Sequence, residues 1–187
     1  LDQALVLSRS GLTLAAPASG AEDIGIVAYG KLGSLELGYN SDLDIVFVYD
    51  QPQGESASSA AHRRHYFGRL VQRLVHILTI RTQAGTLYQI DMRLRPSGRS
   101  GTVVSPLNAY QDYLQGNAWT WEHQALVRAR MVTGHRSLVE RFEAIRRRIL
   151  CRPRNDGALR RAVADMRQRM IDAHSTPASD LFDLKQD

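Results

Sequence analysis

Two aspartates stand at the start of an apolar, strand-like segment, and this feature constrains the fold of the chain more than any other. The segment Leu43–Tyr49 is rich in Ile, Val, Phe and Tyr, and Asp42 and Asp44 lie at its beginning. Residues two apart on a strand share one face, so both carboxylates point to the same side. Like charges beside an apolar segment are costly unless a cation lies between them or one is protonated. A hard divalent cation such as Mg²⁺ meets this requirement, and the alternative is a solvated pair at a strand edge.

A phosphate-binding turn is expected just before this strand. The apolar segment 24–29 leads into a Gly-Lys-Leu-Gly-Ser sequence. Gly33 and Ser34 are expected at the start of a helix, where backbone N–H groups and a hydroxyl can approach a phosphate. Lys31 adds a positive charge beside them. We expect Lys31, Gly33 and Ser34 to bind a triphosphate, together with Ser41 next to the aspartate pair.

A third carboxylate follows in the segment 86–94, which is predicted to be a strand. On such a strand Arg93 and Arg95 have the same parity as Asp91, so the three side chains would share one face. One carboxylate and two guanidinium groups suit a complex of metal and triphosphate. The alternative is that Asp91 simply pairs with Arg93 or Arg95.

The remaining pattern is helical. Apolar residues recur at intervals of three and four, which indicates amphipathic helices. The helical segments are 67–78, 106–114, 138–149 and 159–170, and a further element is expected at 181–184. These elements predict an α+β fold, with a small mixed sheet and flanking helices in a core at 1–115. A helical extension is expected at 116–187.

Composition narrows the class of protein. The chain has 187 residues, a net charge of +5 and 43% hydrophobic residues, which suffices for a core. A single cysteine excludes an internal disulfide and a multi-cysteine zinc site. No apolar run approaches the roughly 18 residues of a membrane span, and no signal peptide is recognisable. We expect a soluble, cytoplasmic protein with no membrane partner, and the missing initial Met suggests a piece of a longer chain.

Two groups of residues fit more than one interpretation. Arg128 and Arg130 could contact phosphates or form a cationic helix face. Trp119 and Trp121 have a spacing more typical of core packing than of a platform for adenine.

The Gly-Ser turn, the Asp-x-Asp strand and the third acidic strand resemble the nucleotidyltransferase pattern of the DNA polymerase β type. The resemblance narrows to one family, that of the bacterial glutamine synthetase adenylyltransferase/adenylyl-removing enzymes. The stretches that carry it are 29–49, 91–101, 119–130 and 182–185.

This family has two homologous halves, of which one removes AMP from glutamine synthetase by phosphorolysis and the other attaches it from ATP. The sequence motifs at 29–33, 38–44, 95–98 and 119–124 are similar to those of the attaching half. Ser34 departs from the family, in which Gly is usual. The resemblance implies that AMP moves from ATP to a tyrosine hydroxyl of glutamine synthetase, with release of pyrophosphate.

The resemblance also implies roles for the residues. Asp42, Asp44 and Asp91 would hold Mg²⁺, expected as two ions, and Asp91 could take the tyrosine proton. Arg93 and Arg95 would join the ATP-binding set. A nitrogen-regulatory signal protein is expected to bind through other parts of the longer enzyme.

Three other functions are compatible with parts of the sequence. The first is the removing half of the same enzyme. The second is an RNA-directed nucleotidyltransferase, favoured only by residues 93–187, which carry 17 basic and 10 acidic side chains. The chain has no recognisable RNA-binding module, so we expect no nucleic acid partner. The third is a non-catalytic docking domain, which the three intact aspartates argue against.

Overall fold

The computed structural model describes residues 1–17, 24–38, 41–83, 85, 86 and 88–174. The element expected at 181–184 and the stretch 182–185 lie outside the described residues. By its contacts the chain divides into two compact units, Leu1–Arg152 and Pro153–Asp187. The elements of the first unit are α1 (Asp2–Ser10), β1 (Ile24–Ala28), α2 (Gly30–Gly33), β2 (Leu43–Tyr49), α3 (Ala57–Thr79), β3 (Arg81–Thr82), β4 (Gly85–Thr86), β5 (Ile90–Asp91), the 3-10 helix η1 (Gly98–Ser100), β6 (Val104–Pro106), α4 (Leu107–Gly116), α5 (Thr120–Ala125), the 3-10 helix η2 (Leu126–Arg128), β7 (Arg130–Thr133) and α6 (Arg136–Leu150).

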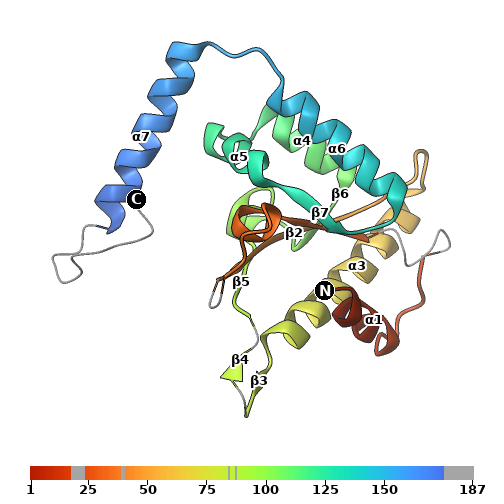
Figure 1. The fold of residues 1–187 in the computed structure, drawn as a ribbon. Coiled ribbons are helices and arrows are strands. Elements are labelled where there is room, and N and C mark those ends of the chain that lie inside the picture. Colours follow the sequence, from red (N-terminus) through yellow and green to blue (C-terminus); the bar gives the residue numbers. More distant parts are fainter. Residues whose placement is uncertain (18–23, 39–40, 84, 87, 175–187) are drawn as a thin grey trace. The chain divides into compact units, whose positions relative to one another are not determined.

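A mixed sheet is the centre of the first unit, in the order β5-β2-β1-β7 (Figure 1). Strands β1 and β2 pair antiparallel from Ile24↔Tyr49 to Ala28↔Ile45. Strand β7 lies antiparallel to β1, whereas β5 and β6 both run parallel to β2. The apolar runs that predicted β1 and β2 therefore become the two central strands, each with neighbouring strands on both sides.

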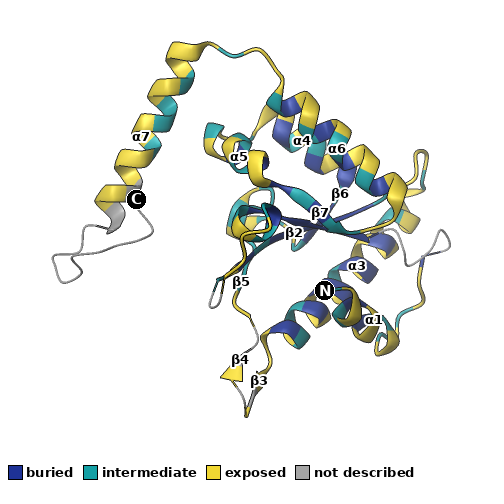
Figure 2. Ribbon diagram, viewed as in Figure 1, coloured by how far each residue is buried: buried dark blue, intermediate teal, exposed yellow. Residues whose placement is uncertain are grey.

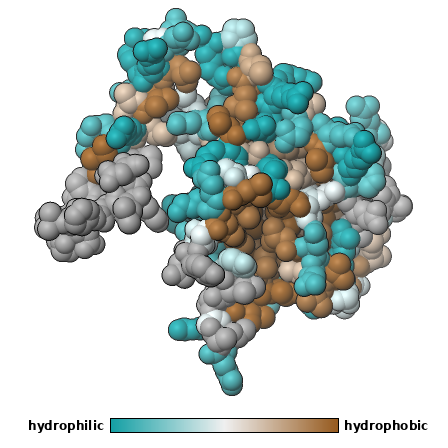
Figure 3. All heavy atoms as spheres, viewed as in Figure 1, coloured by the Kyte–Doolittle hydropathy of each residue, from teal (hydrophilic) through white to brown (hydrophobic). Residues whose placement is uncertain are grey.

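Helices cover both faces of the sheet. Alternate residues of the strands, such as Ile26 and Phe47, point into one core cluster with residues of α1 and α3. The intervening residues, such as Val27 and Val46, point into a second cluster with residues of α4 and α6. Burial on both sides explains why the strands are uniformly apolar. Figure 2 shows the sheet as a buried layer, and Figure 3 shows mostly hydrophilic atoms over α4 and α6.

The α+β class with a small mixed sheet and flanking helices is confirmed. The predicted helices at 67–78, 106–114 and 138–149 fall on α3, α4 and α6. Helix α3 buries one apolar stripe against the sheet, as its three- and four-residue spacing requires.

Two expectations about the first unit differ from the structure. The compact unit reaches Arg152, beyond the expected boundary at 115, because strand β7 of the supposed helical extension pairs with β1. The predicted strand 86–94 is wrong over most of its length. Only Gly85–Thr86 and Ile90–Asp91 are strands, residue 87 lies outside the described residues, and the chain turns directly after Met92.

In the second unit, helix α7 (Asp156–His174) matches the helical pattern predicted at 159–170. Among the described residues, no helix is long and apolar enough to cross a membrane.

Candidate active site

The aspartates meet at the edge of the sheet where β2 pairs with β5. The parallel register sets Asp44 opposite Asp91, and the Leu43 amide donates to the Gln89 carbonyl at 2.8 Å. Neighbouring strands lie about 4.8 Å apart, and partners in register point to the same face. Asp42 precedes Asp44 by two residues and is exposed at the start of the strand. The register thus places Asp44 and Asp91 side by side on neighbouring strands.

Arg93 folds back onto Asp91 and supplies the positive charge beside these carboxylates. Its backbone amide donates to Asp91 Oδ1 at 2.8 Å, and its Nε donates to Asp91 Oδ2 at 2.6 Å. The expectation that Arg93 shares a strand face with Asp91 is wrong, because the chain turns between them. The alternative interpretation, a direct Asp91–Arg93 pair, is the arrangement that the structure has.

Electrostatics agree with this geometry. Partial burial acts to raise the pKa of Asp91, but the hydrogen bonds and charge of Arg93, with the charge of Arg99, bring it below the usual value. The hydrogen bond and charge of Asp91 raise the pKa of Arg93, and the charges of Asp44 and Asp42 raise it further. One guanidinium therefore interacts favourably with all three predicted metal ligands.

Within the described residues, no group of three or more His, Cys, Asp or Glu side chains is arranged to hold a metal ion. Asp91 is turned toward Arg93 in this conformation. The chemistry of the donors nevertheless fits Mg²⁺, because carboxylates from paired strands are the hard oxygen ligands that it prefers. The Arg93 guanidinium holds the countercharge that such an ion would supply.

A cavity of about 450 Å³ opens beside the carboxylates. Four of the predicted site residues, Asp42, Asp91, Arg93 and Arg95, line it, with Val75 and Thr79 of α3 among the others. Arg95 also has a structural role: its guanidinium donates to three carbonyls of its own loop, those of Met92, Arg99 and Gly101. Its predicted position on a strand is wrong for the same reason as that of Arg93.

The predicted phosphate turn is the single helical turn α2, and close packing fixes it between β2 and η2. Gly30 has φ +52°, and a Cβ on it would lie 2.6 Å from Asp44 Oδ2. A Cβ on Gly33 would lie 1.8 Å from the Arg128 carbonyl oxygen, so only glycine fits there. The expectation that Gly33 and Ser34 begin a helix is wrong: the helical turn ends at Gly33, and Ser34 follows it.

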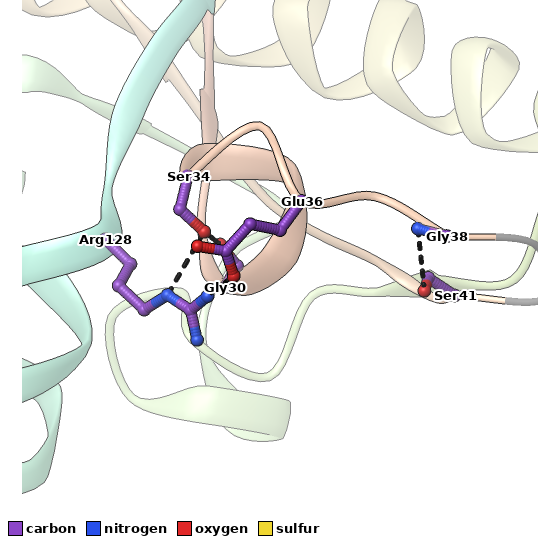
Figure 4. Close-up of polar contacts among 6 residues, drawn as sticks. All are labelled: Gly30, Ser34, Glu36, Gly38, Ser41 and Arg128. Carbon is purple, nitrogen blue, oxygen red and sulfur yellow. Dashed lines mark hydrogen bonds and ion pairs between the residues drawn. The ribbon is translucent and has the colours of Figure 1, made fainter.

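Arg128 crosses to this turn from η2 (Figure 4). The Ser34 hydroxyl donates to the Gly30 carbonyl at 2.8 Å and accepts from Arg128 Nε at 3.1 Å. Arg128 also forms an ion pair with Glu36. The next strand contributes Arg130, whose Nε donates to the Gly33 carbonyl at 3.1 Å. Both arginines therefore hold the turn, a role that sequence reasoning missed because the partners are so distant along the chain.

The other two predicted nucleotide ligands are Lys31 and Ser41, and neither lines the cavity beside the carboxylates. Lys31 is exposed on α2. Ser41 Oγ, directly before Asp42, accepts from the Gly38 amide at 3.3 Å (Figure 4).

A buried pair of hydroxyl groups lies at the start of α2 and was not predicted. The hydroxyls of Tyr29, directly before Gly30, and Tyr110 of α4 are hydrogen bonded to each other. Burial raises the pKa of both phenols, so both stay protonated. Nearby, Glu122 accepts from the Tyr113 hydroxyl at 2.8 Å and from the Trp119 amide at 2.8 Å.

Fold and site together define an α+β nucleotidyltransferase-type core with carboxylates at one sheet edge. The family model described as glutamate-ammonia ligase adenylyltransferase matches residues 3–145, and the chain belongs to this family. It is also 48% identical over 164 residues to the bifunctional glutamine synthetase adenylyltransferase/adenylyl-removing enzyme of Vibrio parahaemolyticus serotype O3:K6 (strain RIMD 2210633). That match covers 87% of this chain but only 17% of the length of the relative. The family resemblance found in the sequence is confirmed.

Proposed function

We propose that this chain transfers AMP from ATP to a tyrosine hydroxyl of glutamine synthetase and releases pyrophosphate. The observation that carries the proposal is the register of Asp44 with Asp91, with Asp42 two residues earlier and a cavity beside them. Membership of an adenylyltransferase family supports assigning nucleotidyl transfer to this constellation.

Asp42, Asp44 and Asp91 would hold Mg²⁺, expected as two ions. When bound, Mg²⁺ neutralises charge on the triphosphate and stabilises the attacking and leaving oxygens. The reorganisation needed in the protein is small, because Arg93 is exposed and can turn from Asp91 toward a phosphate. Arg95 keeps the loop beneath it closed through its three carbonyl contacts.

The turn α2 and its neighbours would hold the β- and γ-phosphates. Lys31 and Arg128 supply positive charge, and Ser34 supplies a hydroxyl. Gly33 lets the backbone lie close to its neighbours. Because Glu36 pairs with Arg128, this carboxylate occupies a place that a phosphate group would compete for.

The attacking phenol has an ordinary pKa of about 10 and must lose its proton during the reaction. Asp91 is the residue that would accept it, because its carboxylate lines the cavity beside Asp42 and would lie within reach of a bound phenol. The proton moves from the tyrosine oxygen to a carboxylate oxygen as the new P–O bond forms and the bond to pyrophosphate breaks.

Attachment rather than removal of AMP is favoured by the sequence motifs at Tyr29, Ser97 and 119–124, which resemble those of the attaching half of the family. The reaction uses ATP and a metabolic enzyme, so we place it in the cytoplasm. Binding of a nitrogen-regulatory signal protein is expected to involve other parts of the longer enzyme.

The experiment is to incubate the full chain with α-labelled ATP, Mg²⁺ and unmodified glutamine synthetase, and to map the labelled residue. We expect label on one tyrosine and release of pyrophosphate. A parallel reaction contains adenylylated glutamine synthetase and phosphate. Release of ADP there, without transfer from ATP, would instead identify the removing activity.

A further inference from the structure

The outward side of helix α3 is strongly basic. Its 23 residues include four Arg and three His and no Asp or Glu. Arg63 is buried and paired with Glu55. Arg69 and Arg73, one helical turn apart, are exposed and form no ion pair with any described residue. Like charges at this spacing repel each other, and nothing in the described chain offsets them.

These arginines lie in a groove that runs along α3. One cavity of about 500 Å³ lies between α3 and residues 11–14. A second cavity of about 340 Å³ lies between α3 and residues 102–104. His65, Arg69 and Gln72 line both cavities, so the two cavities adjoin along this row of α3 side chains, and together we name them the α3 groove.

The lining of the α3 groove combines positive charge with apolar surface. Its basic residues are Arg64, His65, Arg69, Arg73 and His76. Leu12, Leu14 and Val103 pack against the core but are only partly buried, so they leave apolar surface at the two walls. Among the described residues that line the groove, none is acidic and none is Phe, Tyr or Trp.

The floor of the groove is open at Gly68. A Cβ on this residue would meet no atom within 4 Å. Glycine inside a helix disfavours the helix, and here no contact within the described chain requires it. The absence of a side chain leaves the floor flat between the apolar wall and the arginines, which suits close approach by another chain.

We propose that the α3 groove docks an acidic, amphipathic segment of the protein substrate. Its carboxylates would face Arg69 and Arg73, and its apolar side chains would face Val103 and the floor at Gly68. Single-stranded nucleic acid fits less well, because its binding sites use aromatic side chains for stacking. The lining from 61 to 76 extends about 22 Å along the helix, which is the length of about four helical turns.

Helix α3 also connects the groove to the catalytic cavity. Val75 and Thr79 line that cavity, and His76 lines the groove. A protein that presents a single tyrosine to the active site needs further contacts outside it, and a segment held on α3 would provide them. This inference rests on the proposed function, since it takes glutamine synthetase to be the substrate.

The test measures binding of the full chain to immobilised, unmodified glutamine synthetase by biolayer interferometry. The variant R69E/R73E reverses two charges in the groove. Its matched control, R147E/R148E, makes the same change in net charge at two exposed arginines of α6. G68L fills the floor without altering charge. Circular dichroism and melting temperature verify that each variant is folded.

We expect wild-type binding to weaken by about tenfold or more in R69E/R73E and in G68L, and by less than about twofold in R147E/R148E. Binding should also fall with added salt for the wild type. Equal loss in both double variants, no loss in any, or no binding by the wild type would overturn the proposal. So would dependence on Arg69 and Arg73 seen only with single-stranded RNA.

The labelled-ATP assay separates this inference from the proposed function. If AMP is transferred but the affinity for glutamine synthetase is unchanged in the groove variants, the docking site alone is refuted. Binding that depends on Arg69 and Arg73, without any transfer of AMP in either direction, refutes the proposed function alone.

Discussion

The two ends of strand β2 differ sharply although only a few residues separate them. At its start, Asp44 is half-buried and the preceding Asp42 is exposed, next to a partner strand of only two residues. From Ile45 to Tyr49 every residue is buried, and β1 pairs with the strand along this stretch. The polar start of the strand thus follows Asp42, which lines the cavity, while the other half of the strand is anchored in the core.

The difference shows how the site keeps like charges close together. Carboxylates repel, and a mobile segment would let them separate. Here the positions of Asp44 and Asp91 follow from backbone pairing, which the packed half of β2 holds in place. The chemistry and the stability of the strand therefore rest on different residues and can be altered separately.

The largest effect is expected from Asp42→Asn. Removing one charge from the cluster should reduce AMP transfer by about a thousandfold or more, about 4 kcal/mol in transition-state terms, because the proposed Mg²⁺ would lose a ligand. The melting temperature should stay the same or rise, since repulsion falls. Asp112→Asn, at an exposed position of α4, is the control. Near-normal turnover in Asp42→Asn would end the interpretation as a metal ligand.

At the other end of β2, Phe47→Ala should act on stability instead. Phe47 is fully buried, and its removal leaves a cavity, so we expect a loss of about 3–5 kcal/mol in the free energy of unfolding. Chemical denaturation measures it, with the exposed Val6→Ala as control. A loss below about 1 kcal/mol would show that this end of the strand is less tightly packed than described.

Gly33→Ala tests whether α2 contributes both to the stability of the fold and to ATP binding. The added Cβ would lie within 1.8 Å of a backbone oxygen of Arg128, which cannot move cheaply. We expect about 1–3 kcal/mol of destabilisation, together with weaker ATP binding measured by calorimetry. In Gly116→Ala, where the Cβ has open space, both quantities should change little. Unchanged ATP affinity in Gly33→Ala would separate α2 from the nucleotide site.

The smallest effect is expected from Glu36→Gln. It frees Arg128 from an ion pair whose partners are both largely exposed, so the change is worth at most about 1 kcal/mol. We expect ATP affinity to increase by about two- to fivefold at low salt, and the gain to shrink as salt screens the charges. Glu140→Gln, in an exposed pair on α6, should leave ATP affinity unchanged. A decrease in affinity would mean that Glu36 orders Arg128 for binding.

The spacing of apolar residues was enough to predict the central strands and the main helix. The strands around Ile26 and Phe47 and the stripe of α3 follow from apolar spacing, and the parity of Asp42 and Asp44 follows from the strand. The conformation of the segment after Ile90 could not be predicted in this way. It is a strand only where it pairs with β2, which is distant in the chain, and the strand ends where that pairing ends.

Other features depend on contacts that no local pattern encodes. Ser34 and Arg128, 94 residues apart, meet only because β7 joins the sheet. Trp119 and Trp121 were expected in the core, yet their exposed fractions are 67% and 38%. Their helix is short, and its buried polar residue is Glu122.

The short parallel pairing of β2 with β5 also has a kinetic consequence. Its partners come together only after α3 has crossed the sheet, so this contact has a much larger separation in sequence than that between β1 and β2, and it is expected to form later in folding. In the native state, amide protons of β5 and of residues 92–101 should exchange with solvent through local opening, whereas those of β1 await global unfolding. The edge that carries the proposed site is thus expected to open and close many times during the lifetime of a folded core.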